Sequence, residues 1–155
     1  MDAYINTKDF IFEPVTTTDE HISVLYMLLS NRQKTISHSR MPKYSTHEKF
    51  VKNHPYRSWF LVKASQYYIG SFYVTKQNTI GINVFEENTR AVVLDIVSFV
   101  CNNYKPLPPI PSVRCGRFAI NVSPENTSLT EALEEIGAQI LQITYTIPIQ
   151  NKKYE

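Results

Sequence analysis

Residues 118–138 read FAINVSPENTSLTEALEEIGA, and this stretch decides the predicted fold. The run at 118–122 predicts a β-strand. Ser128 and Glu131 have the spacing of a capping box, which begins a helix, and Gly137 suits the left-handed position just past a helix end. The stretch is therefore predicted to be a strand, a short loop and a helix. The apolar stripe of that helix consists of Leu129, Ala132, Leu133 and Ile136.

The same kinds of pattern predict the remaining elements when one works outward from this unit. Ser45 and Glu48 form a second capping box. Residues 105–112, KPLPPIPS, hold four prolines and can be neither helix nor central strand. The predicted strands are 10–15, 58–62, 68–75, 79–85 and 139–147, and the other helices are 19–30, 45–53 and 91–104. This order, β-α-α-β-β-β-α-β-α-β, predicts an α/β protein with a mixed sheet flanked by helices, in a single domain over residues 1–155.

Composition restricts the classes of function. The 155 residues are 43% hydrophobic and 19% charged, which is typical of a folded protein. A net charge of +2 without any cluster of Lys and Arg argues against a nucleic-acid partner. Cys101 and Cys115 lack metal-ligand spacing, and the four histidines form no HExxH motif, so no metal is expected. The N-terminus lacks a signal-peptide pattern and no apolar run could span a bilayer, so we expect a cytoplasmic protein without a membrane partner.

The element order and several motifs resemble the GNAT (Gcn5-related N-acetyltransferase) superfamily. There, a strand ending in "NV.P.N" precedes a helix ending in "YEKLGF"; residues 121–126 read NVSPEN here and residues 133–138 read LEEIGA. The stretches YIGS at 68–71 and TIGINV at 79–84 are similar to two of its central strands. Residues 34–59 are similar to a subgroup pattern, "HTIS…MP.Y..H..FV..HPY..W", and related bacterial transferases acetylate amino groups on nucleotide-linked sugars.

This resemblance implies an acyl-CoA-dependent N-acetyltransferase with acetyl-CoA as co-substrate. Its acceptor would be a primary amine of a small molecule, with an amino sugar as one candidate. The resemblance pairs the strand at 79–85 with the pantetheine amides of CoA and places the loop at 86–91 against the pyrophosphate, at a helix N-terminus. The cofactor-binding residues implied in this way are Asn83, Val84, Phe85, Thr89, Arg90, Ala91, Asn121 and Asn126.

The predicted pyrophosphate loop departs from the superfamily pattern. It contains no glycine, although glycine normally lets a backbone approach phosphate closely. Glu86 and Glu87 would repel a pyrophosphate by about 1 kcal/mol each at 4 Å in water, whereas Arg90 would attract it. The tyrosine that often protonates the leaving thiolate aligns with Leu133. Weak CoA binding is therefore expected, and a catalytically inactive GNAT-fold binding or interaction protein is the alternative function.

The candidates for acceptor-side chemistry are His38, His54, Tyr56 and Glu86. A histidine that titrates near pH 7 can take a proton from an ammonium group. Each candidate also has a structural interpretation: His54 as a hydrogen-bonding residue at a helix end, His38 as an exposed loop residue, Tyr56 as a packing residue and Glu86 as a solvated strand end. Asn126 has two interpretations as well, a contact to CoA or a cap of the last helix. The sequence does not specify the acceptor or the oligomeric state.

Overall fold

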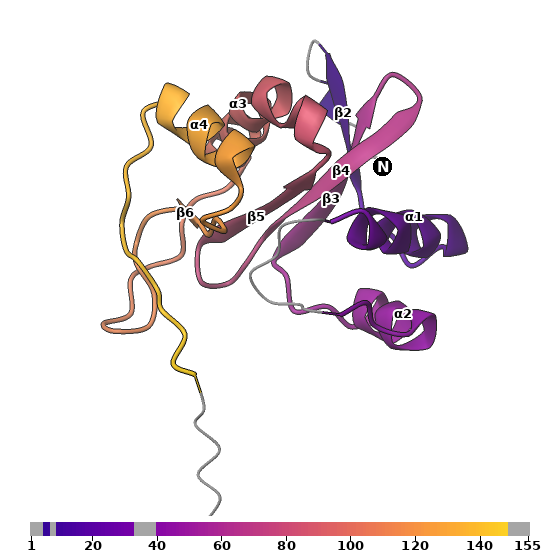
Figure 1. The fold of residues 1–155 in the computed structure, drawn as a ribbon, viewed down its shortest axis with the longest axis horizontal. Coiled ribbons are helices and arrows are strands. Elements are labelled where there is room, and N and C mark those ends of the chain that lie inside the picture. The colour runs from indigo at the N-terminus through magenta and orange to yellow at the C-terminus, as the bar shows by residue number, and fades with distance from the viewer. Residues whose placement is uncertain (1–4, 7–8, 33–39, 149–155) are drawn as a thin grey trace, which may run out of the picture.

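A computed structural model describes residues 5–6, 9–32 and 40–148 (Figure 1). Its centre is a six-stranded mixed sheet in which the strand order equals the chain order. All neighbouring strands are antiparallel except β5 and β6, which are parallel. The strands are β1 (Ile5–Asn6), β2 (Phe10–Pro14), β3 (Ser58–Ala64), β4 (Tyr67–Val74), β5 (Thr79–Val84) and β6 (Ala119–Ile120). The predicted mixed sheet is confirmed, with β1 as an additional short strand.

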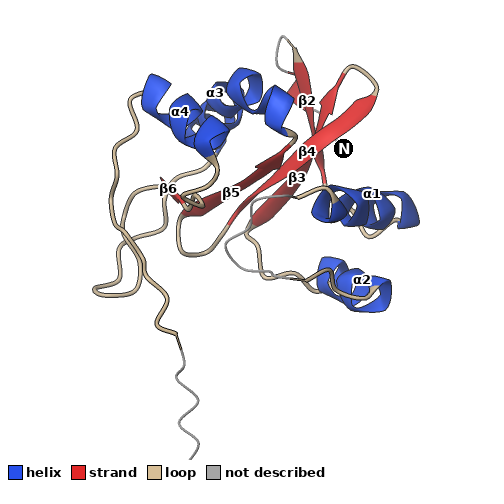
Figure 2. Cartoon of the chain, in the orientation of Figure 1, coloured by secondary structure: helices blue, strands red, loops and turns tan. Residues whose placement is uncertain are grey.

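Four helices cover the two faces of the sheet (Figure 2). Helices α3 (Glu86–Asn103) and α4 (Thr127–Glu135) lie on one face, whereas α1 (Asp19–Ser30) and α2 (Tyr44–Lys52) lie on the other. Helix α3 connects β5 to the region before β6, as a crossover between parallel strands requires. No helix in the described part of the chain is both long and apolar enough to cross a membrane.

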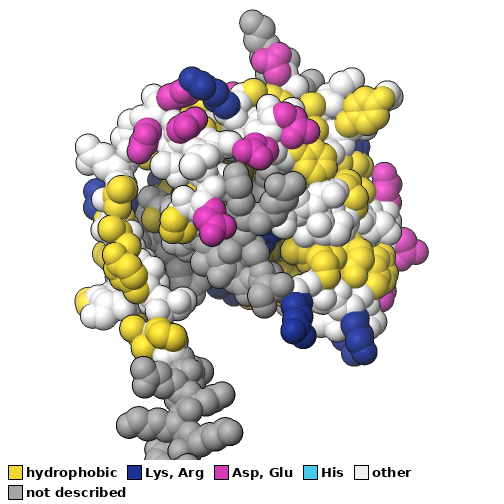
Figure 3. Space-filling view, in the orientation of Figure 1, with side chains coloured by type: hydrophobic (Ala, Val, Ile, Leu, Met, Phe, Trp, Pro, Cys, Tyr) yellow, Lys and Arg dark blue, Asp and Glu magenta, His cyan; other side chains and the backbone are white. Residues whose placement is uncertain are grey.

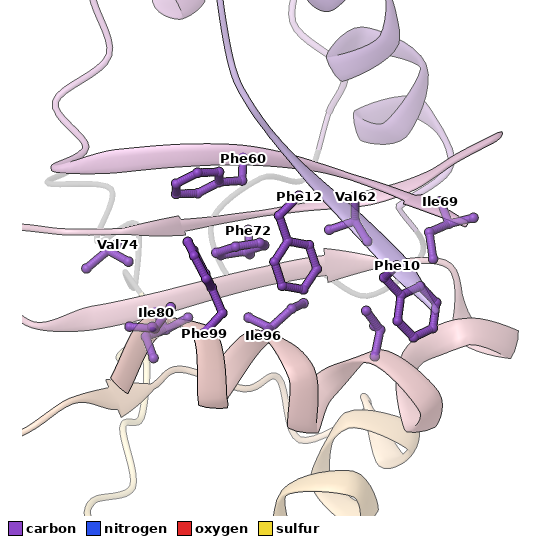
Figure 4. Packing of buried hydrophobic residues seen from close by; sticks show 12 residues of the cluster. Phe10, Phe12, Phe60, Val62, Ile69, Phe72, Val74, Ile80, Ile96 and Phe99 are labelled. Atoms are coloured by element: carbon purple, nitrogen blue, oxygen red, sulfur yellow. The ribbon is translucent and has the colours of Figure 1, made fainter. Parts of the chain in front are cut away.

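Aromatic rings fill the core between the sheet and α3 (Figure 4). The ring of Phe72 meets Phe12 edge-on at 5.0 Å and stacks on Phe60 at 5.0 Å. Phe99 of α3 contacts both Phe12, at 5.4 Å, and Phe60, at 5.2 Å. These rings come from alternate positions of neighbouring strands, because successive strand residues point to opposite faces of a sheet. This packing fixes α3, and with it the helix N-terminus that borders the candidate site.

A buried carboxylate joins α1 to the sheet. His21 Nδ1 accepts the Thr16 N–H at 2.9 Å, so Nε2 carries the proton and donates to Glu13 at 3.1 Å. Lys63 Nζ, at 3.0 Å, and the Tyr68 hydroxyl, at 3.2 Å, reach the other oxygen of Glu13. Burial raises the pKa of Glu13, but the hydrogen bonds from Lys63 and His21 outweigh it and hold that pKa below its usual value.

The turn between β4 and β5 holds the proline-rich connection in place. Asn78 is fully buried and has a left-handed backbone, with φ 63°. Its side-chain Nδ2 donates to the carbonyls of Leu107 and Cys115, both at 2.8 Å, and its Oδ1 accepts the Leu107 N–H at 2.7 Å. The Asn78 carbonyl accepts the N–H of Ala119, the first residue of β6, at 3.0 Å. One residue therefore positions both the connection and the strand that follows it.

Both predicted capping boxes are wrong, because tertiary contacts place these helices differently. Helix α2 begins at Tyr44, where the ring packs against α1, and Glu48 pairs with Lys52 at 2.7 Å instead of capping. Helix α4 is capped by Asn126, whose Oδ1 accepts the Leu129 N–H at 3.3 Å. Its predicted C-terminus is correct: Gly137 has φ 85°, and its N–H bonds the Glu134 carbonyl at 3.0 Å while the Ala138 N–H bonds the Leu133 carbonyl at 3.0 Å.

The predicted final strand at 139–147 is also wrong. Residues 139–148 have no regular secondary structure and make no backbone hydrogen bond to the sheet within the described part of the chain. In Figure 1 this segment leaves α4 and runs away from the sheet. A strand requires a neighbouring strand for its hydrogen bonds, and this segment has none among the residues that the structure describes.

Candidate functional site

Strands β5 and β6 diverge soon after they begin. Their parallel register joins Thr79 to Ala119 and Ile80 to Ile120, and β6 ends at Ile120 while β5 continues to Val84. The two strands are parallel and their pairing ends at Ile80 and Ile120. A cavity of about 170 Å³ lies beside the second half of β5. Its lining comes from α1, β5, α3 and α4: Leu28, Asn31, Arg32, Ile82, Asn83, Val84, Phe85, Glu86, Glu87, Thr89, Asn126 and Leu129.

The divergence leaves one edge of β5 without a strand partner among the described residues. From Gly81 onward, β5 pairs with β4 on one side only. An unpaired edge presents backbone N–H and C=O groups that an extended ligand with amide bonds can match. The predicted cofactor residues Asn83, Val84 and Phe85 lie on this edge or directly after it, and all three line the cavity.

The predicted phosphate loop at 86–91 is instead the beginning of α3. Only Phe85 separates β5 from a helix that starts at Glu86, five residues earlier than predicted. The Asn88 N–H and the Thr89 hydroxyl both bond the Phe85 carbonyl, at 2.9 and 3.1 Å. The signal that could have revealed this start is the pair Glu86 and Glu87, because acidic residues are favoured in a first helical turn.

Charges around the cavity have mixed signs. The predicted phosphate ligand Arg90 pairs with Glu135 of α4 and is not part of the cavity lining. Glu86 accepts a hydrogen bond from the Ser128 hydroxyl at 3.1 Å, which joins the N-terminal turns of α3 and α4. The cation that does line the cavity is Arg32, which follows the end of α1. Sequence reasoning missed Arg32, because it lies in a segment without a recognisable motif.

The other predicted cofactor residues separate into two groups. Thr89 and Asn126 line the cavity, and Asn126 also caps α4, so one of its two interpretations is observed directly. Ala91 and Asn121 are absent from the lining. The site therefore brings together Asn83, Val84, Phe85, Thr89 and Asn126 with Glu86.

His54 lies at a different place from this cavity. It borders a second one, of about 580 Å³, whose lining also includes Trp59, Asn103 and Tyr104. Its Nδ1 accepts the Tyr56 N–H at 3.2 Å, and burial lowers its pKa, which favours the neutral ring. The hydrogen bond agrees with the structural interpretation of His54. His38 lies outside the described residues.

Tyr56 belongs to an aromatic cluster on the α1 and α2 face of the sheet. Its ring stacks on Tyr73 at 3.9 Å with an interplanar angle of 5°. Burial, followed by the neighbouring Tyr73 hydroxyl, raises the pKa of Tyr56, so this hydroxyl keeps its proton at neutral pH. The positive charge of Arg32 lowers the pKa of Tyr56, but burial and Tyr73 outweigh it. Trp59, in the same cluster, has a buried Nε1 without a hydrogen-bond partner in the described structure.

The strand register places the Tyr56–Tyr73 pair on the face of the sheet to which Asn83 points. Tyr73 is opposite Gly81 of β5, and a side chain at Gly81 would collide with the Tyr73 ring. Asn83 is two residues further along β5 and therefore points to the same face as Gly81. This face could accommodate an acceptor next to the cavity. Within the described ranges, no group of three His, Cys, Asp or Glu residues is placed to hold a metal ion.

Several solved structures with this arrangement are acetyltransferases, all of low sequence identity to this chain. AAC(6')-Iy, in complex with the bisubstrate analog CoA-S-monomethyl-acetylneamine, aligns over 91% of this chain and 98% of its own with a TM-score of 0.59 and 12% identity. The microcin C7 self-immunity acetyltransferase MccE, in complex with acetyl-CoA and AMP, covers 84% and 79% with a TM-score of 0.58 and 12% identity. A probable acetyltransferase of the GNAT family from Chromobacterium violaceum covers 88% and 78% with a TM-score of 0.57 and 15% identity. This chain has the GNAT fold.

No family model matches the sequence, and no curated protein is significantly similar to it. The GNAT fold is therefore established by the three-dimensional arrangement. In this GNAT fold Leu133, at the position of the superfamily's tyrosine, is 9% exposed and packs with Val93 and Leu129 between α3 and α4. Leu133 is a core residue, and an apolar side chain supplies no proton.

Proposed function

We propose that this protein is an acyl-CoA-dependent N-acetyltransferase that acetylates a primary amine of a small molecule. The observation that carries the proposal is the free edge of β5 beside the cavity, between the N-termini of α3 and α4. An extended acyl-pantetheine chain could pair its amides with that edge. The N–H groups of the first turn of α3 favour an anion, and Arg32 supplies a positive charge for phosphate.

The reaction has a simple chemical balance. The neutral amine attacks the thioester carbonyl, the C–S bond breaks, and the CoA thiolate leaves while the new amide loses one proton. We propose Glu86 as the proton acceptor, because it is the predicted catalytic residue that lines the cavity. The Tyr56 hydroxyl, with its raised pKa, can donate a hydrogen bond on the acceptor side. His54 and His38 remain proposed acceptor-side residues.

An amino sugar is the acceptor class to test first. AAC(6')-Iy was solved with an analog that joins CoA to an acetylneamine, and MccE was solved with AMP. In this chain the stacked rings of Tyr56 and Tyr73 lie over Gly81, on the same face of β5 as Asn83. Such a combination of an aromatic face and a polar amide suits the apolar and hydroxyl faces of a sugar ring.

The alternative is a GNAT-fold binding protein without catalytic activity. Three features favour it: the connection between β5 and α3 is a single residue without glycine, Glu86 and Glu87 stand at the helix N-terminus, and Leu133 is part of the core. Such a protein would use the cavity for a ligand but would not release CoA.

Two measurements distinguish these functions. Calorimetry with acetyl-CoA reports binding, and a thiol-reactive dye reports free CoA when a panel of amino sugars and polyamines is added. We expect both binding and thiol release, with a loss of turnover of a hundredfold or more in Glu86→Gln if Glu86 is the base. Glu20→Gln, which removes the same charge from the exposed first turn of α1, is the matched control. Binding without thiol release from any amine supports the alternative, and no acetyl-CoA binding overturns the enzyme proposal.

A further inference from the structure

The connection between α3 and β6 is long and rich in proline. It runs over residues 104–118, and its residues 105–111, named here the proline segment, read KPLPPIP. Figure 1 shows that the connection loops outward on the side of the molecule opposite α1 and α2. Connections between elements usually have about 2–6 residues, and a longer ordered one usually has a function of its own. The candidate site uses no residue of the proline segment.

The prolines give this segment the form of a polyproline II helix. Each proline fixes its own φ near about −65° and restricts the residue before it to extended angles. Residues 104–109 accordingly form neither a helix nor a ladder with the sheet. A polyproline II helix has about three residues per turn. Residues 105 and 108 therefore share one edge of the helix, residues 106 and 109 share a second edge, and residue 107 lies on the third.

The body of the protein holds one side of this helix. Leu107 is half-buried, and its N–H and carbonyl bond the side chain of Asn78 at 2.7 and 2.8 Å. The guanidinium groups of Arg57 and Arg114 donate to two further carbonyls of the segment, each at 2.8 Å. Because three side chains from the sheet and the adjoining loops hold its backbone, the proline segment is already ordered in the free protein.

The other side of the helix faces solvent. Lys105, Pro106, Pro108 and Pro109 are all exposed. The two arginines bond the carbonyls of Lys105 and Pro108. Among the described residues, no donor reaches the carbonyls of Pro106 and Pro109. The proline segment therefore presents pyrrolidine rings together with two carbonyl acceptors, in a fixed arrangement.

The surroundings of the proline segment are positively charged. Residues 101–124 contain Lys105, Arg114 and Arg117 but no acidic residue. Lys76, in the β4–β5 turn, is exposed, and its carbonyl bonds Arg114 at 3.0 Å. In Figure 3 the acidic side chains of the visible face gather mainly over α3 and α4, and none is seen where the connection loops outward. A partner that matches this surface is therefore expected to carry acidic side chains.

We propose that the proline segment is a docking site for a partner protein whose groove is lined by aromatic residues and bordered by carboxylates, as in the SH3 type of polyproline recognition. The aromatic rings pack on Pro106 and Pro109, and tryptophan N–H or tyrosine O–H groups donate to the two unbonded carbonyls. A carboxylate of the partner pairs with Lys105. A segment that is already extended loses little conformational entropy on binding. This inference is independent of the proposed function, because it uses none of the residues that line the candidate site.

Calorimetric titration of the full chain with a panel of purified SH3 domains that have acidic grooves tests the proposal. We expect at least one domain to bind, and Pro106→Ala combined with Pro109→Ala to weaken that binding about tenfold or more. Pro124→Ala is the matched control, since it removes an exposed proline outside the segment. Lys105→Glu should also weaken binding about tenfold, whereas Lys49→Glu, which makes the same charge change on α2, should not. The proposal is overturned if no domain binds, or if binding survives the double proline substitution.

Two measurements on the unsubstituted chain keep the test independent of how the variants fold. A free peptide of residues 104–112 should bind the same domain several-fold more weakly than the full chain, because the peptide must be ordered on binding. Equal or weaker binding by the full chain would show that the fold does not present the segment, which overturns the proposal. In ¹H–¹⁵N spectra of the full chain, the bound domain should shift the signals of Lys105, Leu107 and Ile110. Shifts confined to another surface overturn the proposal as well.

Discussion

Substitution of Asn78 should destabilise the protein more than its position in a turn suggests. This side chain is fully buried and makes three hydrogen bonds of 2.7–2.8 Å to the connection that precedes β6. Asn78→Ala removes all three and leaves the N–H of Leu107 and two carbonyls without this partner. A hydrogen bond contributes about 1 kcal/mol net, so their loss costs about 3 kcal/mol. Alanine at φ 63° adds roughly 1 kcal/mol more.

The total of about 4 kcal/mol corresponds to a decrease in Tm of about 8–16 °C for a protein of this size. Thermal and urea unfolding followed by circular dichroism measure this loss. Asn78→Gly separates its two parts, because glycine accepts the left-handed backbone and loses only the hydrogen bonds. Asn78→Asp retains an acceptor for the Leu107 N–H but points a carboxylate oxygen at two carbonyls, so it should be at least as damaging as glycine.

Hydrogen exchange provides a local check on this interpretation. The Leu107 N–H donates to Asn78 Oδ1, so its protection should fall in Asn78→Ala and Asn78→Gly, which both remove this acceptor. Gln77→Ala is the matched control, since Gln77 is the exposed neighbour in the same turn. If Asn78→Ala melts within about 2 °C of wild type, or if glycine restores full stability, the three hydrogen bonds do not hold the connection as argued.

Three further predictions concern the sheet and the cavity. The pKa of Glu13 is lowered in the folded protein, so its ionised carboxylate stabilises the fold. This stabilisation is complete above the unfolded pKa of about 4.3 and is lost as the pH falls through the folded pKa. Glu13→Gln should therefore lower Tm at pH 7, and a Tm difference from wild type that persists unchanged well below pH 4 would contradict this. Glu87→Gln should tighten acetyl-CoA binding several-fold by calorimetry, since one negative charge in the first turn of α3, near the phosphates, is removed, and an unchanged affinity would mean that this side chain points away from them. Gly81→Ala should lower the free energy of unfolding in urea by about 1–3 kcal/mol, because the new methyl group collides with the Tyr73 ring. If Gly81→Ala is equally destabilising in a Tyr73→Ala background, this collision is not the cause.

The regular elements were predictable because their signals are local. The helical pattern of residues 19–30 predicted α1, and Gly137 marked the end of α4 at its observed place. The order of strands and helices was sufficient for the GNAT resemblance, and the structure confirms that fold. The start of α3 was misplaced, because its apolar stripe begins after Ala91 whereas its first turn is marked only by Glu86 and Glu87.

The composition of the candidate site was only partly predictable. Asn83 and Asn126 were expected from the resemblance, and the fold brings both to one cavity. Arg32 was not expected, because nothing in its neighbourhood of the sequence marks it, and only the packing of α1 against the sheet brings it to the end of β5. His54 instead lines a second cavity, with Trp59 and Tyr104, although it is close in sequence to Tyr56.

The sequence by itself determined which segments become helices and strands of the central sheet, because periodicity and turn residues act over a few positions. Only the tertiary structure decided which distant residues each of those segments contacts. The side chain of Asn78 bonds a connection about thirty residues later in the chain, whereas the alternating residues 139–147 have no sheet partner among the described residues. An alternating strand pattern indicates only that a segment is able to pair with another strand. Whether it does depends on a free edge elsewhere, since the hydrogen bonds of a strand are made with another strand and not within itself.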